Sequence, residues 1–385
     1  MTAAEPLVAR MQGFGTTIFA EMSALAVATG SVNLGQGFPD TDGPAEVLQA
    51  AVAAIQDGAH NQYPPGPGIP ELRQAVALHH RRFYGLGFDP DTEVLITAGA
   101  TEAIAAALLA LVDTGDEVVT FEPYYDSYAA CIALAGARRK AVTLRPGDQR
   151  WTFDPDALRD AITPRTKAIL LNTPHNPTGK VFDRAELQLI ADVAVDNDLV
   201  VITDEVYEHL IFDGEHIPIA GLPGMRERTV TIGSAGKTFS VTGWKIGWVC
   251  ATPPLTTAVR TVKQFLTYVN GGPFQPAIAR GLALPDSYYD AVAAQLQQQR
   301  DLLCDGLAEL GYDVIWPQAT YFATVDVHGD AVEFCRALPR DKRVVAIPSS
   351  VFYDSGAGDT HVRFAFCKRP EILAEALIRL KGAAP

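Results

Sequence analysis

The sequence predicts an α/β fold, a mostly parallel sheet flanked by helices and joined to a smaller α+β unit. Three observations predict it. Short β-rich segments alternate with helical patterns through the middle of the chain, as in proteins built from βα units. Segment 200–203 reads Val-Val-Ile-Thr and is nearly all β-branched, which is typical of a strand buried on both faces of a parallel sheet. After about residue 285 the alternation gives way to one long helical pattern and a few short strands.

The elements follow from these patterns in chain order. In the middle of the chain the β-rich runs and helical patterns predict strands at 94–97, 118–121, 168–172, 199–203, 229–232 and 246–250, and helices at 101–112 and 183–196. Beyond residue 285 they predict helix 287–310, strands 321–327 and 362–366, and a closing helix from about 370. Gly and Pro form no linker, so we expect a second domain woven from both ends. The expected division is 1–45 (amino-terminal arm and part of the small domain), 46–285 (large domain) and 286–385 (small carboxyl-terminal domain).

The composition excludes several classes of protein. Of the 385 residues, 48% are hydrophobic and 20% are charged, the profile of a packed globular chain rather than a disordered one. The 45 acidic residues outnumber the 31 Lys and Arg residues and give a net charge of −14, so nucleic acid is not an expected partner. The five cysteines form no CxxC or His/Cys spacing. We therefore expect a reducing compartment, no disulfide framework and no metal site.

No segment is expected to enter a membrane. The longest strictly apolar run, 103–112, has half of the ~20 residues that a membrane-spanning helix needs. The amino terminus carries Glu5 and Arg10 and lacks the apolar core of a signal peptide. A cytoplasmic location is therefore expected.

Polar clusters follow five of the predicted strands, and ligands of open α/β sheets bind at the carboxyl ends of strands. The clusters are 99–102, 122–125, 172–177, 204–207 and 234–237. Together they predict one pocket.

Two of these clusters carry groups with specific chemistry. Lys237 lies between small residues after strand 229–232, where burial disfavours its ammonium form unless a carbonyl compound takes the amine as a Schiff base. The alternative is a surface lysine on a glycine-rich turn. Asp204 ends an apolar strand and needs a charged or hydrogen-bonded partner, or else caps a helix. If the chain coils there, Tyr207 lies about one helical turn from Asp204. The Asp204 carboxylate and the Tyr207 phenol would then face one ligand, and this pair of groups suits a pyridine ring.

The cluster that begins at Gly99 predicts an anion site. Free backbone N–H groups and the helix dipole at the start of helix 101–112 favour a negative charge. The segment has neither the Walker lysine nor the GxGxxG spacing, so a single phosphate monoester fits better than a nucleotide. The alternative is an ordinary N-capped helix.

Taken together, the segments resemble those of a class I aminotransferase of fold type I, a pyridoxal 5′-phosphate (PLP) enzyme, over essentially the whole chain. The matching segments, in order, are 33–40, 62–63, 99–103, 122–126, 172–179, 204–207, 234–248 and 362–364. The resemblance implies a seven-stranded, mostly parallel sheet and a PLP-binding large domain. Within the family, the 35–40 and 234–245 segments are similar to those of the branch that holds kynurenine aminotransferase (glutamine transaminase K) and the bacterial N-succinyldiaminopimelate aminotransferases.

The resemblance also implies a role for each site residue. Lys237 would hold PLP as a Schiff base and later move a proton between the substrate Cα and the cofactor, and Asp204 would keep the pyridine nitrogen protonated. Asn176 and Tyr207 would hydrogen-bond the 3′-oxygen of the ring, and Tyr125 would stack on its face. The residues implied for the phosphate are Ala100, Thr101, Ser234, Lys245 and, from a second subunit of a homodimer, Tyr63. Most class I relatives have an arginine where this chain has Lys245.

The same resemblance implies a substrate site. Arg363 would bind the α-carboxylate with two parallel hydrogen bonds, aided by Gly37 and beside Asn176; the alternative is a surface ion pair on a strand. The chain has Phe19 and Asn270-Gly271 where kynurenine-type relatives tend to have larger aromatic walls. This favours a long acidic substrate, N-succinyl-LL-diaminopimelate, with 2-oxoglutarate as amino acceptor, in lysine biosynthesis. Kynurenine, glutamine or methionine transamination and a cysteine-S-conjugate β-lyase reaction are the alternatives.

Overall fold

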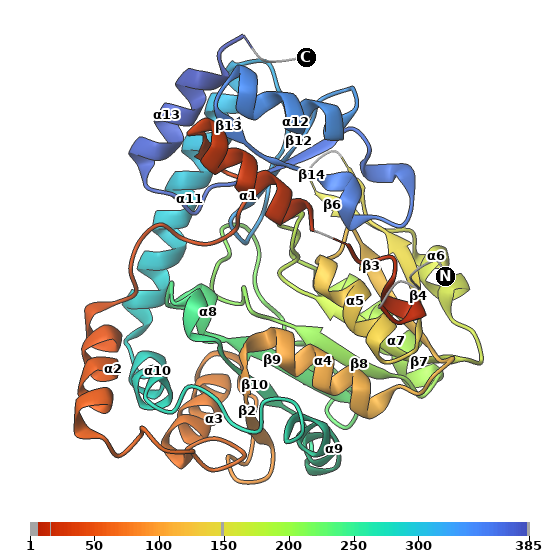
Figure 1. Ribbon diagram of the computed structural model, residues 1–385. Helices are drawn as coiled ribbons and strands as arrows, with labels where there is room; N and C mark the ends of the chain where they lie inside the picture. Colours follow the sequence, from red (N-terminus) through yellow and green to blue (C-terminus); the bar gives the residue numbers. More distant parts are fainter. Residues whose placement is uncertain (1–6, 16, 148–149, 383–385) are drawn as a thin grey trace, which may run out of the picture.

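The computed structural model describes residues 7–15, 17–147 and 150–382. A large central sheet lies between helices, and a second, smaller sheet lies with helices at one end of the molecule (Figure 1). Segments from the amino-terminal and carboxyl-terminal parts of the chain meet in that smaller part, because β1 (Val32–Asn33) pairs in parallel with β13 (Val344–Val345). The division at residues 45 and 285 stays a prediction.

The central sheet has seven strands in the order β2-β10-β9-β8-β7-β3-β4. Their bounds are β2 (Val94–Ala98), β3 (Glu117–Glu122), β4 (Arg138–Thr143), β7 (Thr166–Asn172), β8 (Val200–Asp204), β9 (Thr229–Ser234) and β10 (Ile246–Cys250). All neighbouring pairs are parallel except those of β10, which runs antiparallel to both β2 and β9. The predicted mostly parallel seven-stranded sheet is therefore confirmed. The residue patterns did not indicate β4, because this edge strand opens with Arg138, Arg139 and Lys140 and is only partly buried.

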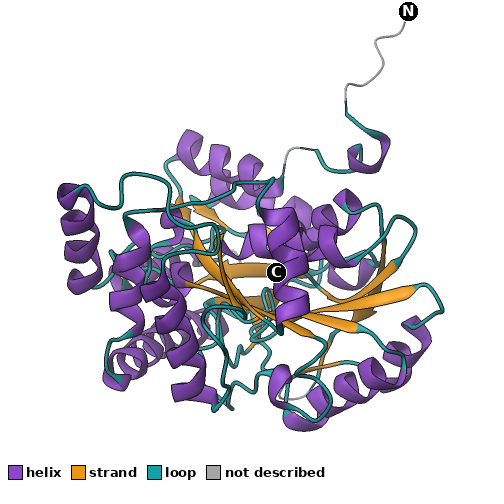
Figure 2. Cartoon of the chain, turned by 90° about the horizontal axis from the view of Figure 1, so that it is seen from below, coloured by secondary structure: helices purple, strands orange, loops and turns teal. Residues whose placement is uncertain are grey.

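Helices cover both faces of this sheet (Figure 2). One face packs against α4 (Gly99–Leu111), α5 (Asp126–Leu134) and α9 (Pro253–Lys263). The other packs against α6 (Pro155–Ala161) and α7 (Arg184–Asp196), and near β2 and β10 against α2 (Ala45–Asp57), α3 (Pro70–Tyr84) and α10 (Phe274–Leu282). This two-sided cover explains why β8 and β10 read as continuous apolar runs.

The smaller sheet is antiparallel, in the order β11-β12-β15-β14. Its strands are β11 (Asp313–Ile315), β12 (Phe322–Asp326), β14 (Ile347–Pro348) and β15 (His361–Ala365), and its helices are α11 (Asp286–Glu309), α12 (Ala331–Asp341) and α13 (Pro370–Leu380). The amino-terminal helix α1 (Ile18–Thr29) shares their hydrophobic core through Met22 and Ala26.

Short elements make the remaining connections. They are β5 (Arg145–Pro146), β6 (Trp151–Thr152), α8 (Ala235–Thr238) and the 3₁₀ turns Ala9–Met11, Ile219–Gly221, Thr242–Trp244, Ser349–Phe352 and Gly356–Gly358. Among the described residues, no helix combines the length and the apolar character needed to cross a bilayer.

Candidate active site

A cavity of about 510 Å³ lies at the carboxyl ends of the central parallel strands, where the polar clusters meet. The predicted single pocket is therefore confirmed. Every site residue expected from the sequence except Tyr63 lines it: Phe19, Gly37, Ala100, Thr101, Tyr125, Asn176, Asp204, Tyr207, Ser234, Lys237, Lys245 and Arg363. The wall is contributed by both sheets, because Arg363 lies on β15 and Asp204 on β8.

Lys237 lies in the single turn of α8 directly after β9. Its Nζ is 5.8 Å from the centre of the Tyr207 ring and 5.7 Å from that of Tyr321. No hydrogen bond or ion pair of this Nζ occurs within the described part of the chain. Burial lowers the pKa of the Lys237 amine, partly opposed by the nearby charge of Asp204. A lowered pKa increases the fraction of neutral, nucleophilic amine, so the alternative of a surface lysine is wrong.

Asp204 ends β8 and is 5% exposed. Its Oδ2 accepts a hydrogen bond of 2.6 Å from the Tyr128 hydroxyl, and its Oδ1 accepts a longer one of 3.4 Å from the Val206 N–H. Burial outweighs both bonds and raises the pKa of Asp204 to about 6. A buried carboxylate at a cavity wall with no ion pair among the described residues is matched best by a cationic ligand. The helix-cap alternative is wrong, because a turn and no helix follows Asp204.

Asn172, at the end of β7, orients this edge of the cavity. Its Nδ2 donates to the carbonyl of Asp204 at 2.8 Å, and its Oδ1 accepts from the Asn176 N–H at 2.7 Å. Sequence reasoning placed Asn172 in a cluster but assigned it no role, and it missed Tyr128. The available signal was the nearness of Tyr128 in sequence to Tyr125, the N-cap residue of α5, since Tyr128 lies in the first turn of that helix.

The amino terminus of α4 is the candidate anion site. Ala98, the N-cap residue, gives no side-chain hydrogen bond to the helix, so the alternative of an ordinary capped helix is wrong. Ala100 and Thr101 line the cavity, and Lys245 Nζ lies 3.4 Å from Thr101 Oγ1. Gly99 has φ +72°, and a Cβ there would lie 3.2 Å from Lys245 Cε. Open N–H groups, a helix dipole and one ammonium group favour a phosphate.

Arg363 forms the other end of the cavity. It is 2% exposed, and its Nη1 and Nη2 donate to Asn176 Oδ1 at 3.2 Å and to the Gly35 carbonyl at 2.9 Å. Its Nε has no partner, and the aromatic rings of Phe322, Phe352 and Phe19 lie 4.1, 5.0 and 5.2 Å from its Cζ.

Burial lowers the pKa of Arg363 to about 10, because no carboxylate among the described residues pairs with this guanidinium. The alternative of a surface ion pair is therefore wrong. A buried guanidinium with unused N–H groups at a cavity wall is suited to bind a carboxylate.

Tyr63 lies outside this cavity. It is 82% exposed and lines a separate cavity of about 350 Å³ together with Asn270 and Gly271. The Asn270 Nδ2 is engaged with the carbonyls of Thr97 and Lys245. In a single chain, therefore, Tyr63 and the Asn270-Gly271 pair do not line the main cavity, where the sequence analysis expected them to contact the phosphate and the substrate.

Comparison with known proteins gives consistent matches. The sequence model of the family "Aminotransferase class I and II" matches residues 29–380. The chain is 53% identical to a probable N-succinyldiaminopimelate aminotransferase, DapC, of Mycobacterium tuberculosis, over 98% of each chain. It is 39% identical to a methionine aminotransferase of Escherichia coli, again over 98% of each. A solved structure of the N-succinyldiaminopimelate aminotransferase from Mycobacterium tuberculosis superposes with a TM-score of 0.96, covering 98% of this chain and 100% of that chain at 53% identity.

Proposed function

This chain belongs to the class I and II aminotransferases, and from that premise we propose that it transfers the amino group of N-succinyl-LL-diaminopimelate to 2-oxoglutarate with PLP as cofactor. The observation that carries the substrate assignment is the 53% identity to the Mycobacterium tuberculosis relative over nearly the full length of both chains. The 39% identity to the Escherichia coli methionine aminotransferase supports the alternative less strongly.

The residues of the cavity fit PLP. The family uses this cofactor, and its three recognisable parts, an aldehyde, a basic ring nitrogen and a phosphate, each have a matching group. Within the described residues, the amine of Lys237 has no hydrogen-bond or ion-pair partner, the buried carboxylate of Asp204 has no cation, and the N-cap residue of α4 makes no side-chain hydrogen bond. Bound PLP supplies an electrophilic carbon and a ring that accepts the electron pair left when the substrate Cα–H bond breaks.

Lys237 and Asp204 have different roles toward the cofactor ring. Lys237 would hold the aldehyde carbon of the cofactor and, when its amine is free, would take the proton from the substrate Cα. Asp204 would keep the ring nitrogen protonated, and Tyr128 fixes the orientation of the Asp204 carboxylate. Tyr207 and Asn176 face the same space from two turns at strand ends. Since Asn176 Oδ1 accepts from Arg363, its Nδ2 is the atom available to donate to the 3′-oxygen.

The Ala100 and Thr101 N–H groups, the Ser234 hydroxyl and Lys245 would hold the phosphate, and Tyr125 would cover the ring face. At the other end, Arg363 would bind the substrate α-carboxylate. Gly37 belongs to this end for a steric reason, because a Cβ there would lie 2.3 Å from the Phe322 ring that packs on the Arg363 guanidinium.

A homodimer completes the site in this proposal. Tyr63 lies next to Tyr268, with ring centroids 5.7 Å apart, and the exposed fractions of Tyr63, Phe265 and Tyr268 are 82%, 82% and 50%. Exposed aromatic side chains in one region indicate a protein interface. Through it, the partner subunit's Tyr63 would reach the phosphate. The cytoplasmic location stays a prediction.

A single-turnover comparison of substrates tests the function. The PLP form is mixed with N-succinyl-LL-diaminopimelate, L-methionine or L-kynurenine, and conversion to the pyridoxamine form is followed by absorbance. We expect the succinylated substrate to react fastest at equal concentration. A faster reaction with methionine or kynurenine would overturn the substrate assignment and leave the aminotransferase chemistry intact. Pyruvate release from a cysteine conjugate without any oxo acid would identify a β-lyase instead.

A further inference from the structure

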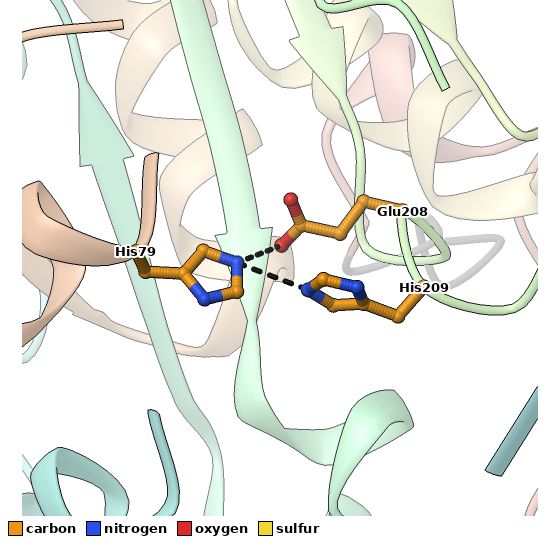
Figure 3. Close-up of side chains that lie close together, drawn as sticks. All are labelled: His79, Glu208 and His209. Atoms are coloured by element: carbon orange, nitrogen blue, oxygen red, sulfur yellow. Dashed lines mark hydrogen bonds and ion pairs between the residues drawn. The ribbon is translucent and has the colours of Figure 1, made fainter. Parts of the chain in front are cut away.

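A second group of ligand-type side chains lies away from the active-site cavity. His79 comes from α3, and Glu208 and His209 come from the turn that follows β8. Figure 3 shows the two imidazole rings and the carboxylate turned toward one another. Asp204 ends β8, and Tyr207 lies in the turn that follows it. The segment 204–209 therefore lines the cavity with Asp204 and Tyr207 and faces α3 with Glu208 and His209.

The separations of these donor atoms suit one metal ion. His79 Nε2 lies 3.1 Å from His209 Nε2 and 3.4 Å from Glu208 Oε1, and the three ligand atoms lie within 4.8 Å of one another. Two ligand atoms at the usual zinc distances in a tetrahedral site are about 3.3 Å apart. The two measured contacts match that edge length.

The charge of the group is incomplete without a cation. The Glu208 side chain is 5% exposed, its Oε2 has no hydrogen-bond partner, and no Lys or Arg pairs with it within the described ranges. A neutral His79 ring carries at most one hydrogen on Nε2, yet this atom faces both His209 and Glu208. One of the two contacts therefore lacks a proton. Leaving a buried carboxylate in this state is costly, and a divalent cation at the centre would satisfy all three groups.

Aromatic side chains pack around the rings of the group. The His79 ring centroid lies 4.8 Å from that of Phe83. Phe83 and Tyr289 pack on His209, with ring centroids 4.6 and 4.3 Å away.

The other titratable groups nearby are engaged or neutral. Glu205 is committed to His216 at 2.8 Å and to Thr203 at 3.1 Å, so its carboxylate is not a free ligand. Burial and the charge of Glu208 raise the pKa of the Tyr84 hydroxyl, which stays protonated.

We propose that His79, Glu208 and His209 bind one divalent transition-metal ion, with Zn²⁺ as the preferred species. Two imidazoles and one carboxylate form a donor set that zinc takes in tetrahedral sites, with water or the second carboxylate oxygen in the fourth position. The ion would connect α3 to the turn that follows Asp204 and contains Tyr207, so its role is structural. The sequence pattern predicted no metal site, since 130 positions separate His79 from His209.

Metal stoichiometry tests the proposal without reference to turnover. The untagged PLP-loaded protein is stripped with a chelator, given an excess of Zn²⁺ and gel-filtered, and its zinc is measured by mass spectrometry. We expect about one Zn²⁺ per chain in the wild type and in His328→Gln, and less than a tenth of that in His209→Gln. His328 is a matched control, because it is an exposed histidine beside Asp313 and Asp326. Equal zinc in the His209→Gln variant would overturn the proposal.

Two further measurements keep the test decisive if a variant folds poorly. In the wild type, Co²⁺ in place of Zn²⁺ should give the intense visible absorption of a tetrahedral N/O site, and Zn²⁺ should raise the melting temperature of the stripped protein. A wild type that retains no zinc, or shows only the weak spectrum of six-coordinate Co²⁺, would refute the site by itself.

Discussion

Replacing Arg363 by Gln isolates the part of the binding energy that comes from the substrate carboxylate. The guanidinium is 2% exposed, has hydrogen bonds only to Asn176 and Gly35, and lacks a carboxylate partner among the described residues. Its pKa is lowered to about 10 by burial. The charge therefore opposes folding, and in the proposed function a bound carboxylate would pair with it. We expect Arg363→Gln to be at least as stable as the wild type toward urea.

The effect on catalysis is large and specific. Hydrogen bonds to charged groups contribute about 1.5–3 kcal/mol each, so a two-bond clamp contributes about 3–6 kcal/mol. A loss of about 4 kcal/mol is about 10³-fold in kcat/KM. Arg363→Lys keeps a point charge without the planar fork, and we expect a loss of about 10- to 100-fold, between the wild type and the Gln variant.

The assay pairs two substrates. Single-turnover rates are measured for the preferred amino acid and for the amine that lacks its α-carboxylate. The wild type should prefer the amino acid by about 10³-fold, and Arg363→Gln should lose this preference while reacting with the amine within about threefold of the wild-type rate. Equal slowing of both substrates in the variant would refute the reasoning, since it would show that Arg363 acts on the cofactor or on the fold.

Three other substitutions probe the remaining parts of the cavity. Lys237→Ala should leave the fold intact and lower the turnover rate by at least about 10⁴-fold. Borohydride should no longer fix the cofactor to this variant, and a fully active variant would contradict the assignment. Asp204 has a pKa of about 6 in the folded protein against an ordinary 3.8. The folded protein therefore holds this proton to higher pH, and without cofactor its stability falls by about 2 kcal/mol between pH 4 and pH 7. Asp204→Asn should remove that loss, so urea midpoints of the two cofactor-free proteins should diverge as pH rises; parallel curves would exclude the raised pKa. Gly37→Ala should lower the free energy of unfolding by about 1–3 kcal/mol, because its Cβ would lie 2.3 Å from the Phe322 ring. An unchanged urea midpoint would exclude the steric role.

The sequence predicted the positions of those site residues that lie at the ends of neighbouring strands. In a parallel sheet the carboxyl ends of the strands share one edge, so residues after β7, β8 and β9, among them Asn176, Asp204 and Lys237, could be placed together from their positions alone. Arg363 is on a different sheet, and only the family resemblance connected it with this group. The helix-cap and surface readings failed because they treated each residue apart from its neighbours.

Other features depended on contacts that no local pattern carries. The β4 strand is charged because it lies at a sheet edge, where its polarity conceals it from a search for apolar runs. Tyr63 lies outside the main cavity of a single chain, so its predicted contact requires a second copy. The His79 group joins two elements far apart in sequence, and its histidines show no ligand spacing.

The reversed direction of β10 places both active-site lysines within one connection. Because Ile246 pairs with Ala98 and Gly247 with Ser234, β10 starts at the edge where its neighbours end. The connection from β9 to β10 therefore begins and ends at the edge of the sheet where the cavity lies. Lys237 and Lys245 therefore come from a single short loop. For protein engineering, an insertion or circular permutation in this connection is expected to displace both amines. The link between α4 and β3 at 113–116 is mostly exposed at the opposite edge and is the rational place to open the chain or attach a label.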